Sequence, residues 1–277
     1  MYNALSIDLE FWYSGEPFIE YARSTYEDQV EAATEPILKL FKENDIHATF
    51  FVLGEVAEKY PELIKTIQEN GHEIASHGFT HKRLHLSDKN SFSDDILHSK
   101  KILKNLTGEY PIGYRAPSFS LDNSTIWALD VLKTQGFLYD SSLYPVKMRF
   151  YGEPNVPLSP YHPSSKDIMK IDNSNPFLEF PVTVFSYRNK YIPISGGFCF
   201  RIIPTSILTS AFRKVNQERP VLVYIHPWES YAETPKLDLP IWWRFTSYYN
   251  AKHLLTKLEH VVHHMHFTTI RETLNLP

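Results

Sequence analysis

The stretch Glu73-Ile-Ala-Ser-His-Gly-Phe-Thr-His81 is a short extended run that ends in two histidines. Glu73 to Ser76 reads as a strand, and His77 and His81 follow it four positions apart. This is a metal-ligand spacing, because one turn can bring two imidazole nitrogens within the roughly 2.0–2.1 Å at which zinc is bound. Two hydrogen-bonded histidines at a strand end would give the same pattern, so further ligands must be sought elsewhere.

Helical and extended patterns alternate on both sides of this stretch. Residues 27–44 carry apolar side chains at helical spacing, and residues 47–53 form an apolar run typical of a buried strand. A second helical pattern begins at Gly54, restarts at Pro61 and ends at Asn70-Gly71. Strand, helix, strand, helix, strand is the order of parallel β/α units.

The same alternation continues to the C-terminus. Further helices are predicted at 87–106, from 122 or 123 to 135, at 204–216 and at 250–264, and extended segments at 137–142, 178–184, 191–201, 221–226 and 266–269. Units of this number and length predict an α/β fold, a TIM-like (β/α) barrel of about seven or eight strands, with functional residues where strands end. We expect one domain over residues 1–277, with an irregular excursion at about 144–175.

The first strand supplies two acids to one face. Leu5, Ile7 and Leu9 alternate with Ser6, Asp8 and Glu10 over residues 2–10. Two carboxylates side by side are unfavourable unless a cation lies between them or one of them holds a proton. Exposed acids on an edge strand would also fit, but the apolar residues between them favour a strand in the core.

Composition excludes several other classes. The chain has 277 residues, a net charge of −4 and an isoelectric point near 6.4, which argue against nucleic acid or an anionic membrane bound by bulk electrostatics. A single cysteine, Cys199, rules out an internal disulfide. No signal-like leader and no apolar run of transmembrane length are found in the sequence, so a cytoplasmic location is expected.

Six residues fall at or just past the ends of predicted strands, namely Asp8, Glu10, His77, His81, Arg115 and His226. Over nearly its whole length the chain resembles the polysaccharide deacetylases, carbohydrate esterase family 4 with its NodB-like domain, which implies a distorted barrel. The resemblance rests on Ser6-Ile-Asp-Leu-Glu10, Ala48-Thr-Phe-Phe51, Ser76-His-Gly-Phe-Thr-His81, Arg115-Ala-Pro117 and Ile225-His-Pro227. The C-terminal part, at about 228–277, looks like the branch associated with exopolysaccharide and exosortase gene clusters.

The resemblance implies a divalent metal, with zinc expected, held by Glu10, His77 and His81, and a general base at Asp8. Most of the family has two adjacent aspartates, whereas Leu9 stands in the second place here. Because side chains alternate along a strand, Glu10 still lies beside Asp8. Which of the two acids binds metal and which takes a proton stays open. The resemblance also suggests the backbone N–H of Ser118 as a donor to the oxyanion.

Further roles are expected around this centre. An amine leaves poorly unless protonated, so a general acid is required, and His226 at its strand end is the candidate. Arg115 is expected beside Asp8, keeping it ionised, and Asp140 is a candidate to orient His226. The candidates for contact with sugar rings are the aromatic residues Trp228, Trp242 and Tyr139.

The leading functional prediction is a metal-dependent hydrolase that removes an N-acetyl group from an amino sugar in a polysaccharide or glycan precursor. Two alternatives stay open. One is a related C–N amide hydrolase, such as a deformylase of a lipid-linked sugar or a ureide hydrolase. The other is a catalytically inactive carbohydrate-binding protein. The expected partner is therefore a carbohydrate, and a lipid-linked one fits as well, while the sequence does not indicate an oligomeric state.

Overall fold

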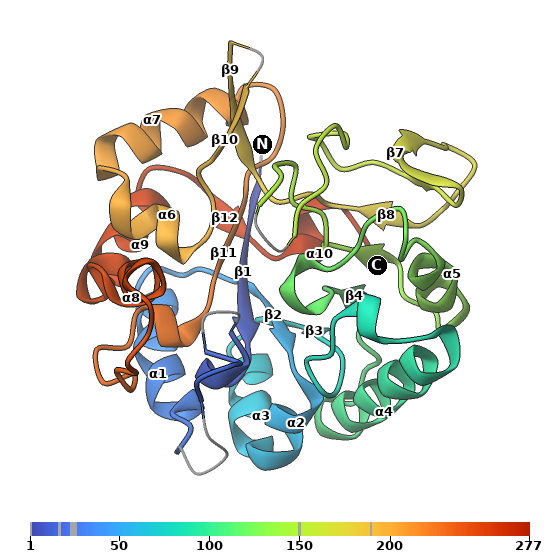
Figure 1. Ribbon diagram of the computed structural model, residues 1–277, viewed down its shortest axis with the longest axis horizontal. Coiled ribbons are helices and arrows are strands. Elements are labelled where there is room, and N and C mark those ends of the chain that lie inside the picture. Colours follow the sequence, from blue (N-terminus) through green and yellow to red (C-terminus); the bar gives the residue numbers. More distant parts are fainter. Residues whose placement is uncertain (1, 16–17, 23–26, 149–150, 189) are drawn as a thin grey trace.

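The computed structural model describes residues 2–15, 18–22, 27–148, 151–188 and 190–277 (Figure 1). Its centre is a curled parallel sheet in the order β11-β1-β2-β3-β4-β5-β8, with β12 pairing with β1. These strands are β1 (Asn3–Leu9), β2 (Thr49–Val52), β3 (Glu73–Ser76), β4 (Gly113–Tyr114), β5 (Tyr139–Asp140), β8 (Leu178–Glu179), β11 (Leu222–Ile225) and β12 (Phe267–Thr268). The predicted barrel of seven or eight strands is confirmed.

Thr183 joins the two ends of the curled sheet. It lies just past β8, and its backbone N–H and side-chain hydroxyl both bond to Leu222 of β11, at 3.4 and 2.7 Å. Because the strands of this sheet are paired in parallel, their carboxyl ends lie on one rim.

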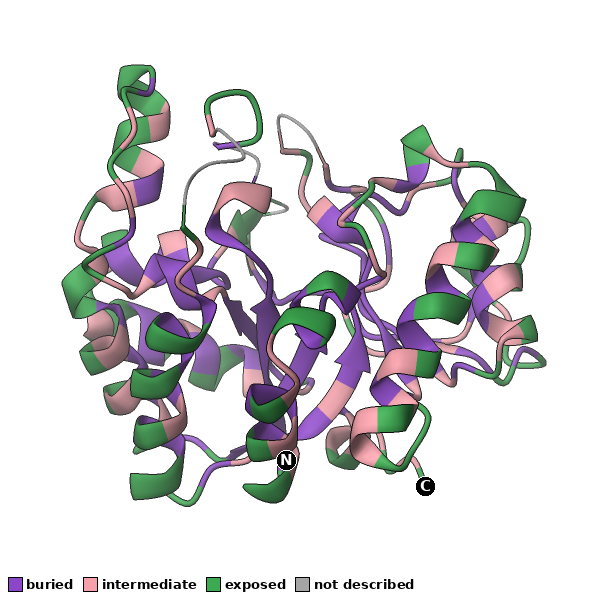
Figure 2. Cartoon of the chain, turned by 90° about the horizontal axis from the view of Figure 1, so that it is seen from below, coloured by how far each residue is buried: buried purple, intermediate pink, exposed green. Residues whose placement is uncertain are grey.

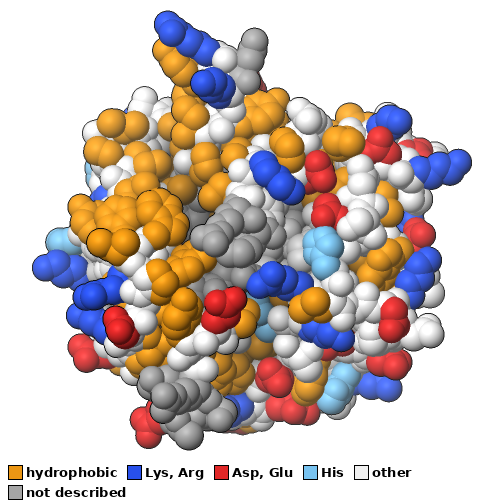
Figure 3. All heavy atoms as spheres, viewed as in Figure 1, with side chains coloured by type: hydrophobic (Ala, Val, Ile, Leu, Met, Phe, Trp, Pro, Cys, Tyr) orange, Lys and Arg blue, Asp and Glu red, His pale blue; other side chains and the backbone are white. Residues whose placement is uncertain are grey.

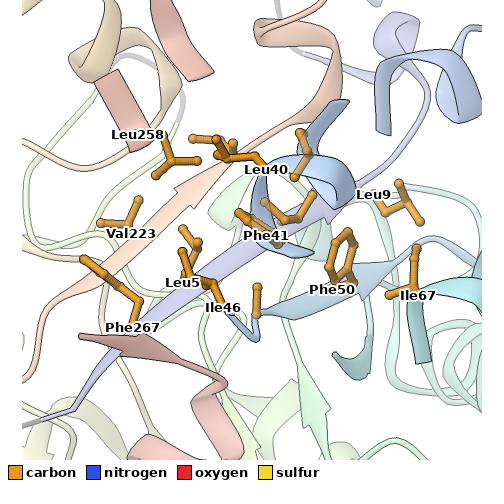
Figure 4. Close-up of a cluster of buried hydrophobic side chains, with 14 of the residues drawn as sticks. Leu5, Leu9, Leu40, Phe41, Ile46, Phe50, Ile67, Val223, Leu258 and Phe267 are labelled. Atoms are coloured by element: carbon orange, nitrogen blue, oxygen red, sulfur yellow. The ribbon is translucent and has the colours of Figure 1, made fainter. Parts of the chain in front are cut away.

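Strand β1 is buried on both faces, because all seven of its residues are buried. Its apolar face packs outward against the surrounding helices, where Leu5 and Leu9 join a cluster with Leu40, Phe41 and Phe50 (Figure 4). Its polar face points into the barrel, where Ser6 and Asp8 meet a buried arginine. The alternation favoured a strand in the core, and the structure shows that its polar face has partners inside the barrel in place of water.

Helices surround the sheet, with buried strands at the centre and exposed residues on the outer helix faces (Figure 2). They are α1 (Val30–Glu43), α2 (Gly54–Lys59), α3 (Pro61–Glu69), α4 (Lys89–Thr107), α5 (Trp127–Thr134), α6 (Gly197–Ile202), α7 (Thr205–Asn216), α8 (Ile241–Tyr248), α9 (Leu254–Val262) and α10 (Ile270–Thr273). The ends of α4 show why the sequence sets these bounds. Asp88 accepts from the N–H groups of Asn90 and Ser91, and Gly108 ends the helix with a φ of +81°.

Two hairpins stand outside the main sheet. Strands β6 (Pro163–Ser164) and β7 (Asp167–Ile171) pair within the predicted excursion at 144–175, of which residues 149–150 lie outside the described part. Strands β9 (Val184–Tyr187) and β10 (Lys190–Pro193) form the second hairpin, which projects at the top of Figure 1. None of the described helices combines the length and the apolar composition needed to cross a membrane.

The prediction of an extended segment over 191–201 was wrong beyond Pro193. Strand β10 ends there, and helix α6 begins at Gly197. The turn between them depends on Gly196, whose φ is +97° and whose absent Cβ would lie 2.8 Å from the ring of Tyr224. This turn brings α6 to the rim of the barrel, beside the site described next.

Candidate active site

Three of the predicted ligands converge at the rim of the barrel. Glu10 directly follows β1, and His77 and His81 follow β3. The Nε2 atoms of His77 and His81 lie 3.6 and 2.6 Å from Oε2 of Glu10, and the three ligand atoms lie within 4.8 Å of one another. Two donors on a tetrahedral zinc ion are about 3.3 Å apart, so this cluster can close on one ion with small shifts.

Hydrogen bonds orient the imidazole of His77 and fix the turn that leads to His81. Nδ1 of His77 lies 2.8 Å from the backbone oxygen of Arg115, which can only accept, so Nδ1 carries the proton and the Nε2 lone pair faces the cluster. Asp95 of α4 accepts from the Phe79 N–H at 2.7 Å and from the Thr80 hydroxyl at 2.9 Å. The turn between the two histidines is therefore fixed from outside the site.

The surroundings of Glu10 favour its ionised form. Burial raises the pKa of its carboxyl, but the charges of His81 and His226 and hydrogen bonds from His77 and His81 bring the pKa well below its usual value. The indole Nε1–H of Trp228 also donates to Oε1 at 3.3 Å. A buried carboxylate beside two imidazole nitrogens is the donor set expected of a divalent-metal site.

Asp8 is held by a buried ion pair. Nη1 of Arg115 donates to Oδ1 of Asp8 at 2.6 Å and to the Ser6 hydroxyl at 2.9 Å. The same guanidinium donates to Ser141 through Nε and Nη2, at 2.9 and 2.8 Å, and lies 4.1 Å from the ring centre of Phe51. Arg115 and Asp8 therefore lie side by side as expected, with Oδ2 of Asp8 left to face the pocket.

His226 completes the cluster from β11. Its Nε2 lies 3.8 Å from Oδ2 of Asp8 and 3.7 Å from Oε1 of Glu10. Its Nδ1 donates to Glu229 at 2.9 Å, and Glu229 is paired with the buried Arg201 at 3.3 Å. Burial lowers the pKa of His226, but the charges of Glu10, Glu229 and Asp8 and the bond to Glu229 outweigh it and raise the pKa to about 9. The imidazole can therefore carry a proton at neutral pH.

The prediction that Asp140 orients His226 is corrected by the structure, because Glu229 occupies that position. Asp140 instead accepts from the Ser142 hydroxyl at 2.6 Å, and Ser142 in turn accepts from the Ala116 N–H at 2.7 Å. Asp140 also faces Glu179, its neighbour across the β5–β8 pairing. Burial, the charge of Asp140 and the hydrogen bond between the two carboxyls raise the pKa of Glu179 well above its usual value, so Glu179 holds the proton that joins them.

This shared proton predicts a pH-dependent stability. Folded Glu179 keeps its proton above pH 4.5, its ordinary pKa, whereas the unfolded chain releases it, so the free energy of unfolding falls as pH rises. Glu179→Gln can still donate to Asp140 and should lack this slope, which amounts to about 1.4 kcal/mol per pH unit. Urea unfolding between about pH 5 and pH 7 measures it. Exposed Glu62→Gln serves as the control, and parallel curves for Glu179→Gln and wild type would place the proton elsewhere.

The three aromatic candidates do not lie together: one is inside the barrel, and two line the cavity. Tyr139 is fully buried and donates to Glu73 at 2.9 Å, and its ring covers Gly113, so its predicted contact with substrate is corrected to a packing role inside the barrel. Trp228 lies beside His226, with ring centres 5.2 Å apart and nearly parallel planes. Trp242 lies on α8 and is 57% exposed, and both tryptophans line the cavity above the metal cluster.

Ser118 also borders this cavity. It has a left-handed backbone, with φ of +55° and ψ of 28°. Within the described part of the chain its buried hydroxyl has no hydrogen-bond partner, and no backbone acceptor is found for its N–H. Such a conformation is unfavourable for a residue with a Cβ and persists where the surroundings impose it. A donor held in this way is free to bond a ligand oxygen.

The cavity has a volume of about 400 Å³ and reaches from the metal cluster to α6 and α8. Its polar lining residues are Asp8, Glu10, His77, His81, Ser118, Ser195, His226, Glu229 and Thr246. The rest of its wall is mainly apolar or aromatic, and includes Phe119, Tyr144, Met148, Tyr151, Phe198, Ile202, Tyr224, Trp228, Trp242 and Trp243. The site thus combines a charged floor with apolar sides.

Sequence reasoning missed Glu229, Arg201 and Asp95. Glu229 follows His226 by three positions in a turn, a spacing that could have identified it as the histidine's partner. Asp95 lies one residue before the apolar Ile96 on α4, and nothing in its local sequence links it to the turn at 78–80. Arg201 lay in the segment predicted as a strand, so its partner could not be assigned.

Two family descriptions match the chain in succession. Residues 19–137 match the family described as Polysaccharide deacetylase, and residues 141–275 match Domain of unknown function (DUF3473). The first region contributes β2 to β4 and the second β8, β11 and β12. Strands from both regions belong to the one curled sheet.

Curated relatives match a part of the chain. The peptidoglycan deacetylase of Helicobacter pylori is 37% identical over 107 residues, which cover 39% of this chain and 36% of the relative. The peptidoglycan-N-acetylglucosamine deacetylase of Bacillus cereus is 34% identical over 108 residues, covering 38% and 39%. The matched stretch thus spans less than two-fifths of the length of either relative.

Solved structures match the fold over almost the whole chain. A putative polysaccharide deacetylase from Mycobacterium smegmatis superposes with a TM-score of 0.61 at 19% identity, covering 99% of this chain and 88% of the other. The structure of PuuE allantoinase gives 0.60 at 20% identity, covering 98% and 88%. At such identities the likeness establishes the shared fold.

Proposed function

Because the chain carries a polysaccharide deacetylase domain in residues 19–137, we propose that it is a metal-dependent hydrolase that removes the N-acetyl group from an amino sugar. The relatives named above are deacetylases of peptidoglycan. For this chain the substrate is an N-acetylated amino sugar in a polysaccharide or a glycan precursor. We propose zinc as the resident ion, since two imidazoles and one carboxylate suit it.

One observation carries the proposal. The cluster of Glu10, His77 and His81 lies next to an ion-paired acid, Asp8, and an imidazole, His226, whose Nδ1 is bonded to Glu229. Amide hydrolysis needs these three elements together, namely a cation site, a base and an acid. A purely carbohydrate-binding site has no use for an acid and a base within 4 Å of each other, as His226 and Asp8 are here.

The residues divide the reaction among them. A divalent ion at the cluster would lower the pKa of a neighbouring water and polarise the amide carbonyl. Asp8, fixed by Arg115, takes a proton from the water while the water oxygen forms the new C–O bond with the carbonyl carbon. The N–H of Ser118 donates to the carbonyl oxygen as negative charge builds. His226, held through Nδ1 by Glu229, delivers a proton from Nε2 to the amine nitrogen as the C–N bond breaks.

The test is acetate release by zinc-loaded protein from a panel of N-acetylated amino-sugar oligomers. We expect a new free amine for each acetate released, and loss of both after chelation of the metal. Activity on formylated sugars or ureides alone would instead favour the related C–N hydrolases. Sugar binding without turnover at any metal loading would favour the binding protein. The cytoplasmic location expected from the sequence stays a prediction.

A further inference from the structure

We propose that the substrate is an amphiphile: an N-acylated amino sugar on a lipid anchor, which the exposed face of α8 receives at a lipid surface. The inference rests on the proposed function and names its substrate class. Two observations carry it, namely the apolar walls of the cavity and their continuation onto the outside of the molecule. Their junction is Trp242, which lines the cavity and is 57% exposed.

The exposed face of α8 is large and apolar for a short helix. Ile241 is 88% exposed, Phe245 39% and Tyr249 50%, and Ser247 is the one buried residue of the eight. Ile241, Trp242, Phe245 and Tyr249 lie at positions that share one side of a helix. Hydrophobic side chains gather on the side of the molecule where α8 lies in Figure 3. Patches of this kind on a surface mark a contact with another apolar body.

The patch and the cavity form one continuous apolar path. Phe198 of α6 lines the cavity, and its ring centre lies 6.4 Å from that of Trp242 and 5.9 Å from that of Phe245. Trp243 and Thr246, on the same helix, also line the cavity. A chain that leaves the metal cluster along these rings therefore arrives at the exposed face of α8 without crossing a polar barrier.

A water-soluble glycan does not suit this path. Its hydroxyls would face Phe119, Met148 and Ile202 on the cavity wall, whose side chains offer no hydrogen bonds. A protein partner or a second copy of the chain could cover α8 but would leave the inner walls unexplained. A lipid anchor accounts for both, because its sugar can reach the charged floor while its alkyl chain lies along the rings.

The composition of α8 agrees with a lipid–water interface. Tryptophan and tyrosine have rings that sit at the level of lipid headgroups, and aliphatic Ile241 is suited to insert. Arg244 is exposed on the same helix, and Lys236 and one acid, Asp238, line the same groove, so positive charge is in excess next to the aromatic face. The expected ligand is therefore an anionic amphiphile, such as a sugar joined to its lipid through phosphate.

The double variant Ile241→Ser/Phe245→Ser tests the proposal, because neither residue lines the metal cavity. Its readouts are co-sedimentation with vesicles of phosphatidylcholine and phosphatidylglycerol, and rates on two substrates with the same N-acetylated sugar. One substrate is a water-soluble oligomer, and the other is a long-chain alkyl glycoside in those vesicles. Leu86→Ser/Leu97→Ser removes exposed leucines outside α8 and is the matched control.

We expect the variant to lose vesicle binding and to hydrolyse the vesicle-borne substrate about 10-fold or more slowly, at an unchanged rate on the soluble one. Equal rates of wild type and variant on both substrates would overturn the lipid anchor and leave the proposed function intact. The lipid anchor would also be overturned if wild type is a dimer, the double variant is a monomer, and both bind vesicles equally well. A wild type inactive on both substrates overturns the proposed function and, with it, this inference.

Discussion

Replacing His77 by alanine is expected to remove metal from the protein and to abolish hydrolysis of N-acetylated amino sugars. The variant leaves two of the three ligands, and the Arg115 carbonyl that fixes the imidazole loses its donor. A Lewis acid supplies several kcal/mol of transition-state stabilisation, so the rate should fall by about 10³-fold or more. Elemental analysis of purified protein and acetate release measure the two effects.

His85 offers the matched control for this prediction. It is a half-exposed histidine paired with Asp122 at 2.8 Å, and His85→Ala should keep both metal and activity. Glu10→Ala should behave like His77→Ala, because Glu10 is the carboxylate of the cluster. Metal retained at wild-type level in Glu10→Ala would transfer the ligand role to Asp8 and leave the base unassigned.

The order of strands and the position of the cluster could be predicted because both depend on local patterns. Period-two alternation in β1 put Asp8 and Glu10 on one side, and strands that end at a shared rim placed His77 and His226 nearby. The parallel order of the sheet followed from alternating strands and helices. None of these steps required knowledge of contacts between distant segments.

The partners of these residues could not be predicted in the same way, because packing chooses among acids of equal chemistry. Asp140 and Glu229 are both buried carboxyls near a strand end, yet Glu229 bonds His226 while Asp140 shares a proton with Glu179. The apolar cavity walls come from segments far apart in the sequence, including Tyr144, Phe198 of α6 and Trp243 of α8. These residues meet at one cavity only in the folded chain, and no local sequence pattern indicates that they do.

Arg115 connects the two halves of the site. Its guanidinium fixes Asp8, and its backbone oxygen fixes His77, so one residue sets both the base and a metal ligand. It is fully buried, and its hydrogen bonds to Ser6 and Ser141 satisfy the donors that Asp8 leaves free. A buried charge is tolerated where it is paired and hydrogen-bonded in this way. The polar residues inside the barrel therefore orient the side chains of Asp8 and His77 at its rim.

Replacing Asp8 by asparagine separates the base from the metal ligands. If Asp8 takes the proton, Asp8→Asn should keep near-stoichiometric metal while acetate release falls by about 10²- to 10⁴-fold. The variant also removes the charge that pairs with buried Arg115, which costs up to about 3–5 kcal/mol of stability. Thermal unfolding must therefore show that the variant is folded at the temperature of the assay.

Asp28→Asn is the matched control for that loss of charge. Asp28 is a buried aspartate side chain paired with Lys59 and bonded to Tyr60 at 2.5 Å, and it does not line the metal cavity. Its replacement should lower stability without lowering the rate. Loss of metal in Asp8→Asn, with Asp28→Asn unaffected, would show that Asp8 is a ligand. The proton would then have to be taken by another group that faces the cavity, and Glu10 is the acid beside it.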